Sequence, residues 1–271
     1  MNTVSYNLLG KFGRLGNCMF QYASTLGIAR KLNRTPTASI SQVDHFSDCF
    51  KLGSVVDRII EPTGIYVESS FCFDEKVFRI PEQCQHVEAR GYFQTEKYFS
   101  HVADEVRDNF SFSDDIKEKA KKYLPDDKTV SIHVRRGDYV HLTEQGFHAA
   151  LFDYYKKALE YFPNHTPVVF SDEIKWCKDN FDFCPSSTVF VDDDSYDVNL
   201  SAQKNSDISG YIDMCSMSMC DAHIITNSSF SWWGSYLGQG KTIAPSPWFG
   251  PTGPQDFYDV YCQDWTVLNN E

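Results

Sequence analysis

The stretch Thr129–His148, TVSIHVRRGDYVHLTEQGFH, decides the fold class. Its first six residues are rich in β-branched side chains and predict a short buried strand. This strand runs directly into Arg135 and Arg136, two adjacent positive charges in a protein whose formal net charge is −12. Two adjacent arginines at the end of a buried strand therefore suggest that they bind an anionic group.

Strands and helices alternate on the C-terminal side of this stretch. Because the expected strands are short and β-branched, the alternation indicates βα units and a parallel sheet. In such sheets ligands collect beyond the carboxyl ends of the strands, which is where the two arginines lie. The expected elements are a helix at 152–162, a strand and helix within 166–181, a strand within 187–194, a helix at 209–220, a strand, turn and helix within 221–238, and a last strand and loop within 241–249.

The N-terminal part begins in the same way, with a short strand, a glycine-rich turn and a helix that ends near Asn33. Residues 41–110 are irregular, and only a strand within 86–94 and a helix over 98–109 are predicted there. A helix within 113–127 starts at a Ser113 cap and stops at Pro125. We therefore expect an α/β protein with two Rossmann-like domains, residues 1–126 and residues 127–271.

Composition and charge exclude several classes of protein. Hydrophobic residues make up 42% and charged residues 23%, as in ordinary globular proteins. With 25 Lys+Arg against 37 Asp+Glu, the overall field repels polyanions, so nucleic acid is not an expected partner. An anionic ligand must then be held by a local positive site.

The cellular compartment is predicted from cysteine usage, from the first residues of the sequence and from the length of its apolar runs. Nine cysteines without CxxC spacing favour a reducing compartment. The sequence shows no leader-type start and no apolar run long enough to form a transmembrane segment. These features predict a soluble cytoplasmic protein, and a lumenal domain of a Golgi-type enzyme without its anchor is the alternative.

The motif HVRRGDY carries the strongest chemical signal. His133 and Arg135 lie on the same side of the predicted strand, and Asp138 can pair with a guanidinium. Guanidinium groups match phosphate oxygens and keep their charge, so Arg135 and Arg136 can bind a pyrophosphate without a metal ion. Fixed cations there would also stabilise the charge on a departing nucleoside diphosphate. The alternative is an ion-paired surface loop.

Three other stretches give weaker signals. TNSSFSWW, residues 226–233, places hydroxyl groups at a helix start that favours an anion, although an ordinary serine cap explains it equally well. GRLGN, residues 13–17, matches neither GxGxxG nor a P-loop and indicates a tight turn. VFVDDDSYD, residues 189–197, contains a DxD pattern, for which a solvated acidic turn is the favoured interpretation. No zinc-type spacing occurs, and neither a metal nor a cofactor is expected.

Taken together, several motifs resemble the α-1,2-fucosyltransferases of glycosyltransferase family 11. These motifs are GRLGNCMFQYA, HVRRGDY, FSDEIKWCKDNF, DMCSMSMCDAHIITNSSFSWWGSYL and APSPWF, in family order from Gly13 to Phe249. The resemblance implies a GT-B-like fold of two facing Rossmann-type domains, the first on the acceptor side and the second binding GDP-fucose. It also implies inverting, metal-independent transfer of L-fucose from GDP-fucose to a galactose O2 on a glycan acceptor.

The same resemblance assigns roles to individual residues. Arg135 and Arg136 would contact the pyrophosphate and the glycosidic oxygen, His133 and Asp213 would face the guanine, Ser228 and Ser229 would bind phosphate, and Gly16 and Asn17 would border the donor and the acceptor.

The catalytic base stays open at this point. Glu144 lies at a place similar to the base of α-1,6-fucosyltransferases, but the α-1,2 family does not regularly carry a glutamate there. Asp138 is the rival, although we expect it to hold an arginine. The alternatives to the whole interpretation are a fucosyltransferase of another linkage or acceptor, a metal-dependent transferase using the DxD pattern, and a non-catalytic module that binds a sugar nucleotide or a glycan.

Overall fold

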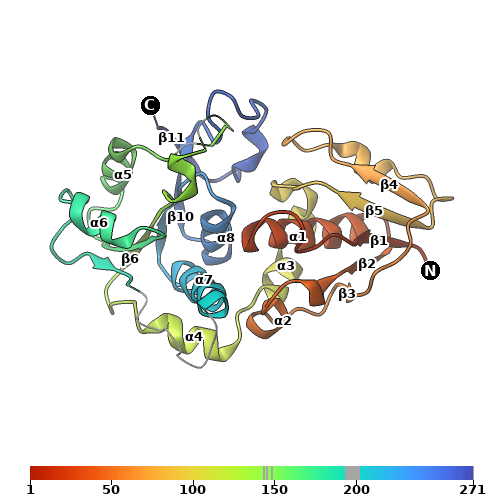
Figure 1. Cartoon of the computed structure of the whole chain (residues 1–271), viewed down its shortest axis with the longest axis horizontal. Helices are drawn as coiled ribbons and strands as arrows, with labels where there is room; N and C mark the ends of the chain where they lie inside the picture. The colour runs from red at the N-terminus through yellow and green to blue at the C-terminus, as the bar shows by residue number, and fades with distance from the viewer. Residues whose placement is uncertain (143, 145, 148, 193–201, 271) are drawn as a thin grey trace. The chain divides into compact units, whose positions relative to one another are not determined.

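Two compact units make up the chain in the computed structural model shown in Figure 1. One contains Met1–Ser113 and Asp256–Cys262, and the other contains Asp114–Gln255 and Gln263–Glu271. The structure describes residues 1–142, 144, 146–147, 149–192 and 202–270, with the backbone alone for residues 202–207. Each unit is built on one parallel sheet, so the predicted α/β class with mainly parallel sheets is confirmed.

The division between the units falls before helix α4 (Asp114–Lys121), whereas the sequence predicted a division at 126/127. Helix α4 packs against α7 (Ala202–Ser218) of the second unit. Its buried Ile116 and Ala120 are four residues apart and so share one face. The Ser216 hydroxyl donates a hydrogen bond to the Ala120 carbonyl at 3.1 Å. The pattern showed that α4 has an apolar face but not which half of the chain covers it.

The first unit has a five-stranded sheet in the order β3-β2-β1-β5-β4. Its strands are β1 (Thr3–Tyr6), β2 (Thr35–Ala38), β3 (Val56–Asp57), β4 (Gly64–Val67) and β5 (His86–Arg90). Its helices are α1 (Leu15–Lys31), α2 (Phe46–Cys49) and α3 (Ala103–Asn109), with short 3-10 turns at Ile40–Gln42, Glu75–Arg79, Glu96–Tyr98, Ser100–Val102 and Tyr258–Val260. Helix α1 is buried along most of its length, as its apolar sequence requires.

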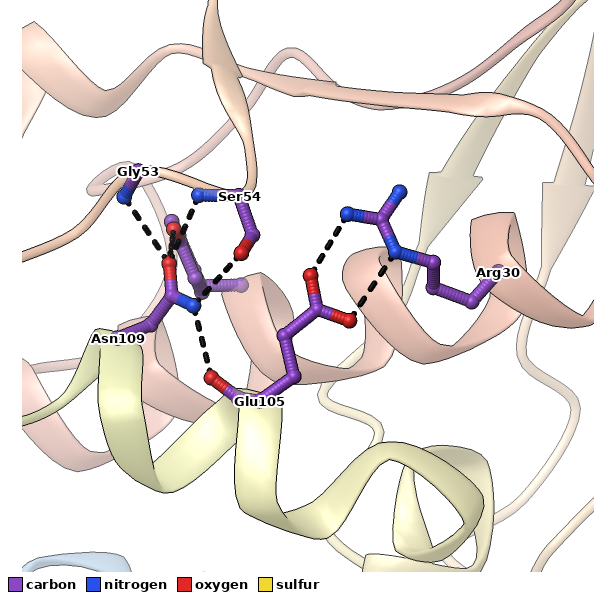
Figure 2. A network of polar contacts seen from close by, with 6 residues as sticks. Arg30, Gly53, Ser54, Glu105 and Asn109 are labelled. Carbon is purple, nitrogen blue, oxygen red and sulfur yellow. Dashed lines mark hydrogen bonds and ion pairs between the residues drawn. The ribbon is translucent and has the colours of Figure 1, made fainter.

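Aromatic rings fill the core of the first unit beside α1. Tyr22, Phe46, Phe50 and Phe110 contact one another with ring centroids 5.2 to 6.0 Å apart. Next to them lies the buried Asn109, the last residue of α3, whose amide Figure 2 shows facing Gly53 and Ser54. Rings and amide together fix the irregular residues that gave no periodic signal in the sequence.

The second unit has a six-stranded sheet in the order β11-β10-β9-β6-β7-β8. Its strands are β6 (Thr129–Val134), β7 (Thr166–Ser171), β8 (Val189–Phe190), β9 (Ala222–Ile224), β10 (Lys241–Ser246) and β11 (Thr266–Asn269). Its further helices are α5 (Phe152–Leu159), α6 (Ile174–Asn180) and α8 (Ser229–Gly238), with a 3-10 turn at Asp138–Val140. Strand β6 pairs with β7 and β9, and every residue in it is buried.

Most expected elements are present, but some expectations need correction. The helix expected at 209–220 spans Ala202–Ser218. The helix expected over 98–109 is regular only from Ala103, because two 3-10 turns precede it. Four strands, β2, β3, β4 and β11, were not predicted; β3 has only two residues, and β2 contains Pro36, a poor strand former. Among the helices described, none is long and apolar enough to cross a membrane.

Candidate functional site

Two neighbouring strand ends position the arginine pair. Strands β6 and β7 are parallel, with Val134 opposite Ser171. The residues that follow each strand therefore lie side by side at the carboxyl edge of the sheet. They are Arg135–Arg136 after β6 and Asp172–Glu173 after β7, so the chain places two cations beside two anions.

Arg135 is held from two sides. Its Nη2 donates to Asp138 Oδ1 at 2.6 Å, and its Nη1 lies 2.9 Å from Asp172 Oδ2. Its Cζ is 5.6 Å from the centroid of the Tyr139 ring. Asp138 thus pairs with a guanidinium, as its place in the motif predicted, and the orientation of Arg135 is fixed.

Arg136 is anchored along one edge only. Its backbone N–H donates to Asp172 Oδ1 at 3.0 Å, and its Nε donates to Glu173 Oε2 at 3.1 Å. The guanidinium lies over the Trp176 ring, with Cζ 3.6 Å from the centroid, and its side chain is 24% exposed. Within the described part of the chain, its two Nη groups donate to no protein acceptor. A planar donor edge is therefore left for a ligand.

Gly137 allows the Asp172 carboxylate to reach both arginines. A Cβ added at Gly137 would lie 2.5 Å from Asp172 Oδ2, which is too close for any other residue without a shift. The glycine of the RRGD motif is thus required by the close approach of a carboxylate from the next strand.

The charge balance of this cluster differs from the expected cationic pocket. Arg135 and Arg136 face three carboxylates, those of Asp138, Asp172 and Glu173. The formal charge of the cluster is therefore not positive. What the carboxylates provide is orientation, since each holds a guanidinium in one geometry before any ligand arrives.

His133 adds an unused hydrogen-bonding group beside the arginines. It is buried, and its ring centroid lies 5.2 Å from that of Phe230. Burial, with a smaller effect of Arg135, lowers the pKa of His133 to about 3, so the ring is neutral at physiological pH. Its Nδ1 is buried without a hydrogen-bond partner among the described residues. Buried polar atoms are normally paired, so this nitrogen is suited to a ligand.

The start of α8 approaches His133 through Phe230. Ser228 is the N-cap of this helix, and its Oγ accepts a hydrogen bond from the Phe230 N–H at 3.3 Å. Ser229 is the first helical residue and is half-buried. The capping role that we gave as the alternative for this motif is therefore present. A cap does not exclude an anion, because the helix start still presents N–H groups.

The other predicted site residues are distributed as follows. Asp213 lies on α7 and is half-buried. Gly210, three residues before it on the same helix, lies near Phe230, since a Cβ added at Gly210 would be 3.8 Å from the Phe230 ring. Glu144 is exposed, and residues 143 and 145 beside it lie outside the described residues. The structure thus brings His133, Arg135, Arg136 and Asp138 together in one cluster, with Ser228 and Ser229 reached through Phe230.

Gly16 and Asn17 belong to the first unit. Gly16 is buried at the start of α1, and Asn17 Oδ1 accepts a hydrogen bond from Gln94 Nε2 at 2.7 Å. Asn17 packs on Gly13, whose φ of +83° suits glycine and where an added Cβ would meet the Asn17 amide at 2.0 Å. The bend expected for residues 13–17 is confined to Gly13 and Arg14, because α1 already begins at Leu15. The roles of Gly16 and Asn17 toward a donor and an acceptor stay predictions.

Sequence reasoning missed the residues that hold the arginines. Asp172, Glu173 and Trp176 are in the quoted motif FSDEIKWCKDNF, but none was assigned a role. Aligning the ends of β6 and β7 places RR beside DE, once it is known that these two strands are neighbours. Phe230 was also missed, since nothing in its sequence context distinguishes a ring beside His133 from a ring in the core.

The DxD pattern gives little evidence on metal binding. Asp192 pairs with Lys178, and residues 193–197 lie outside the described residues. Among the residues that are described, no group of three His, Cys, Asp or Glu side chains could hold a metal ion.

A cavity of about 150 Å³ lies next to the arginine cluster. Arg136, Trp176 and Tyr155 line it together with Val134, Leu151 and Phe152. The Arg136 guanidinium therefore borders a small, mainly apolar space as well as the sheet edge.

Comparison with known proteins identifies the family. The Glycosyl transferase family 11 domain matches residues 70–269. An α-1,2-colitosyltransferase of Escherichia coli is 31% identical, covering 88% of this chain and 90% of that protein. Galactoside α-(1,2)-fucosyltransferase 2 of Pongo pygmaeus is 28% identical, covering 91% of this chain and 73% of that protein.

Solved structures show the same fold at low identity. The NodZ α-1,6-fucosyltransferase soaked with GDP-fucose aligns with a TM-score of 0.56 at 14% identity, covering 87% of this chain and 92% of that chain. POFUT1 in complex with GDP aligns with a TM-score of 0.52 at 13% identity, covering 90% and 98%. These likenesses show that the fold is GT-B-like. On the family match and the 31% identical relative, the chain belongs to glycosyltransferase family 11.

Proposed function

We propose that this protein transfers L-fucose from GDP-fucose to a galactose O2 on a glycan acceptor, forming an α-1,2 linkage with inversion and without a metal ion. The names of the relatives support the linkage and the sugar class, since they include α-1,2-colitosyl- and α-(1,2)-fucosyltransferases. The observation that carries the proposal is the unused donor edge of Arg136, fixed on Trp176 at the carboxyl end of β6.

The arginine pair acts on the leaving group. As the acceptor oxygen bonds to the anomeric carbon, the bond from that carbon to the diphosphate oxygen breaks and its electron pair stays on the diphosphate. Arg136 offers its Nη groups to this growing negative charge, and Arg135 supplies the second cation. Because carboxylates and Trp176 already fix both guanidiniums, no reorganisation is needed during the step.

The guanine would be recognised by the neutral ring of His133 and by the carboxylate of Asp213. The His133 Nδ1, buried and unpartnered in the described chain, can hydrogen-bond to the base. Asp213 can accept hydrogen bonds from the guanine N1 and N2 donors, and the start of α8 at Ser228–Ser229 can take a phosphate oxygen.

Proton removal from the acceptor hydroxyl is assigned to Glu144, which is exposed and therefore accessible. Asp138 is the weaker candidate, because its Oδ1 already accepts a hydrogen bond from Arg135 Nη2 at 2.6 Å and so holds that guanidinium. Replacing Glu144 by Gln tests this role, and a near-normal kcat would dismiss it.

A second candidate donor sugar is colitose. The E. coli relative at 31% identity is an α-1,2-colitosyltransferase, and it covers nearly the whole of this chain. The chemistry at the diphosphate would be the same, so the arginine cluster does not separate the two sugars.

An acceptor screen tests the proposal directly. GDP-fucose is incubated with lactose and other galactosides in the presence of EDTA, and the product linkage is read by NMR. The expected product carries fucose on galactose O2. Transfer to another position, transfer from UDP-sugars, or loss of transfer on EDTA addition would each contradict a stated part of the proposal.

A further inference from the structure

The first unit contains a carboxylate in an unusual setting at the carboxyl edge of its sheet. Strands β4 and β5 are parallel with Val67 opposite Arg90, so Glu68 follows β4 beside Gly91, which follows β5. A Cβ added at Gly91 would lie 2.6 Å from Glu68 Oε2, so glycine is what makes room for the carboxylate. This is the same kind of position that Arg135 and Asp172 occupy in the second unit.

Glu68 is held in place by neutral donors. Its Oε2 accepts hydrogen bonds from the backbone N–H groups of Tyr92 and Phe93 at 2.8 and 2.9 Å. Its Oε1 lies 3.5 Å from the Tyr98 hydroxyl, which is too long for a strong hydrogen bond. No lysine, arginine or histidine within the described residues forms an ion pair with it. One carboxylate oxygen is therefore only weakly satisfied, and the charge is uncompensated.

Burial raises the pKa of Glu68 to about 7, against the opposing effect of its hydrogen bonds. A carboxylate that only stabilises the fold is normally fully ionised and fully hydrogen-bonded, and Glu68 is neither. Carboxyl groups with such properties at the end of a strand are typical of ligand-binding positions.

An aromatic platform borders this carboxylate. The rings of Phe71 and Tyr92 stack with centroids 5.8 Å apart and planes 16° from parallel. Tyr92 is 38% exposed, although its backbone N–H is tied to Glu68. A pyranose has a face of C–H groups that packs on such a ring and an edge of hydroxyls that needs hydrogen-bond acceptors.

We propose that Glu68 and the Phe71–Tyr92 ring pair form a subsite for one sugar residue of the acceptor glycan. The ring of Tyr92 packs against the C–H face of the sugar, and Glu68 Oε1 accepts a hydrogen bond from one of its hydroxyls. This inference rests on the proposed function, in which a galactose-containing glycan is the acceptor, and it adds the residues that bind it.

The test separates sugar binding from transfer. Saturation-transfer NMR with lactose, in the absence of GDP-fucose, is recorded for the unmodified protein and for Tyr92→Ala. Steady-state transfer is then measured for Tyr92→Ala and Glu68→Gln. We expect the lactose NMR signal to disappear in Tyr92→Ala, and the KM for lactose to rise about tenfold in both variants. The KM for GDP-fucose should stay within about twofold.

Tyr258→Ala is the matched control. Tyr258 is 70% exposed and stacks on Phe257 with centroids 5.0 Å apart, but the neighbouring Asp259 is already paired with Lys97. This variant should keep the lactose signal and KM of the unmodified protein.

Each result is decisive. An unchanged lactose KM and NMR signal in Tyr92→Ala would overturn the subsite while leaving the proposed function intact. An equal rise of KM for both substrates would overturn it as well, because it would indicate a general disturbance of the fold. Loss of the NMR signal in Tyr92→Ala in a protein that transfers no fucose would support the subsite and reject the proposed function.

Discussion

Two polar clusters, one in each unit, differ in how fully their hydrogen-bonding groups are paired within the protein. In the first unit, Asn109 Oδ1 accepts hydrogen bonds from Tyr22 Oη at 2.7 Å and from the Gly53 and Ser54 N–H groups at 3.0 and 2.9 Å. Its Nδ2 donates to Ser54 Oγ at 2.8 Å and to the Glu105 carbonyl at 2.7 Å (Figure 2). Every polar atom of this amide is used within the protein.

The cluster at the end of β6 in the second unit is left open. Arg136 keeps two Nη groups without a protein acceptor in the described chain, and the His133 Nδ1 is buried without a partner there. A closed network supports the fold, because removing any member leaves a buried group unpaired. A network with unpaired groups can instead bind a ligand that supplies the missing hydrogen-bond partners. The comparison teaches that the candidate site is distinguished by its unused donors more than by the presence of charge.

Removing Arg136 should give the largest effect on activity. We expect Arg136→Ala to lower kcat/KM about 10²- to 10³-fold, roughly 3–4 kcal/mol of barrier, because a fixed donor to the leaving group is lost. The unfolding midpoint should change little. Arg30→Ala is the matched control, since Arg30 also pairs with a carboxylate, Glu105, at 2.6 Å, but in the first unit. More than a tenth of normal activity in Arg136→Ala would erase the distinction between the two clusters.

Removing Asn109 should lower the stability of the fold and leave the activity of the folded protein nearly unchanged. We expect Asn109→Ala to lower the free energy of unfolding by roughly 2–4 kcal/mol, because the buried Tyr22 hydroxyl and two backbone N–H groups lose their acceptor. Urea denaturation measures this loss. The kcat of the folded fraction should stay near normal, and a protein as stable as the unmodified one would show that the network is not needed for the fold.

The buried histidine should reveal itself in the pH dependence of stability. Burial lowers the pKa of His133 to about 3, below the ordinary value of about 6.5 that the unfolded chain keeps. Between these values the unfolded state binds a proton that the folded state does not, so the free energy of unfolding falls as the pH drops below about 6.5.

Replacing His133 by Phe removes this contribution. The unfolding free energy of His133→Phe should therefore fall less steeply between pH 6.5 and pH 4, by at most about 1.4 kcal/mol per pH unit. His223, whose pKa is lowered to about 4, remains in both proteins and cancels in the difference. Identical slopes would mean that His133 is not neutral in the folded protein.

A small change in GDP affinity is expected when Glu173, one of the carboxylates beside the arginines, is replaced. Glu173→Gln keeps an acceptor for Arg136 Nε but removes a negative charge from the cluster. If the carboxylate serves only to orient the guanidinium, GDP should bind about twofold more tightly at low salt, and the gain should shrink when salt is added. Weaker binding at both salt levels would mean that the charge of Glu173 itself contributes to the site.

Much of the second unit was predictable from the sequence, for physical reasons that particular residues show. Strand β6 ends at Val134 as expected, because its β-branched run stops where Arg135 begins. The alternation of strands and helices then placed the arginines at the carboxyl edge of a parallel sheet. Asp138 was expected to pair with a guanidinium of the same motif, and it pairs with Arg135, three residues before it.

The first unit was harder to predict, because long-range contacts rather than periodic patterns fix it. Residues 53–54 are held by Asn109, more than fifty positions away, and short strands such as β3 have too few residues for a pattern. In the second unit, the contact of Arg135 with Asp172 was missed because it depends on the pairing of β6 with β7. Knowing which strands are neighbours would have revealed it.

The most direct test of the central claim is calorimetric titration of GDP in EDTA into the unmodified protein, Arg136→Ala and Arg30→Ala. We predict metal-independent binding to the unmodified protein, at least tenfold weaker binding to Arg136→Ala, and unchanged binding to Arg30→Ala. Binding that disappears in EDTA, or that is equally strong in Arg136→Ala, would contradict the claim that the open guanidinium edge holds the diphosphate.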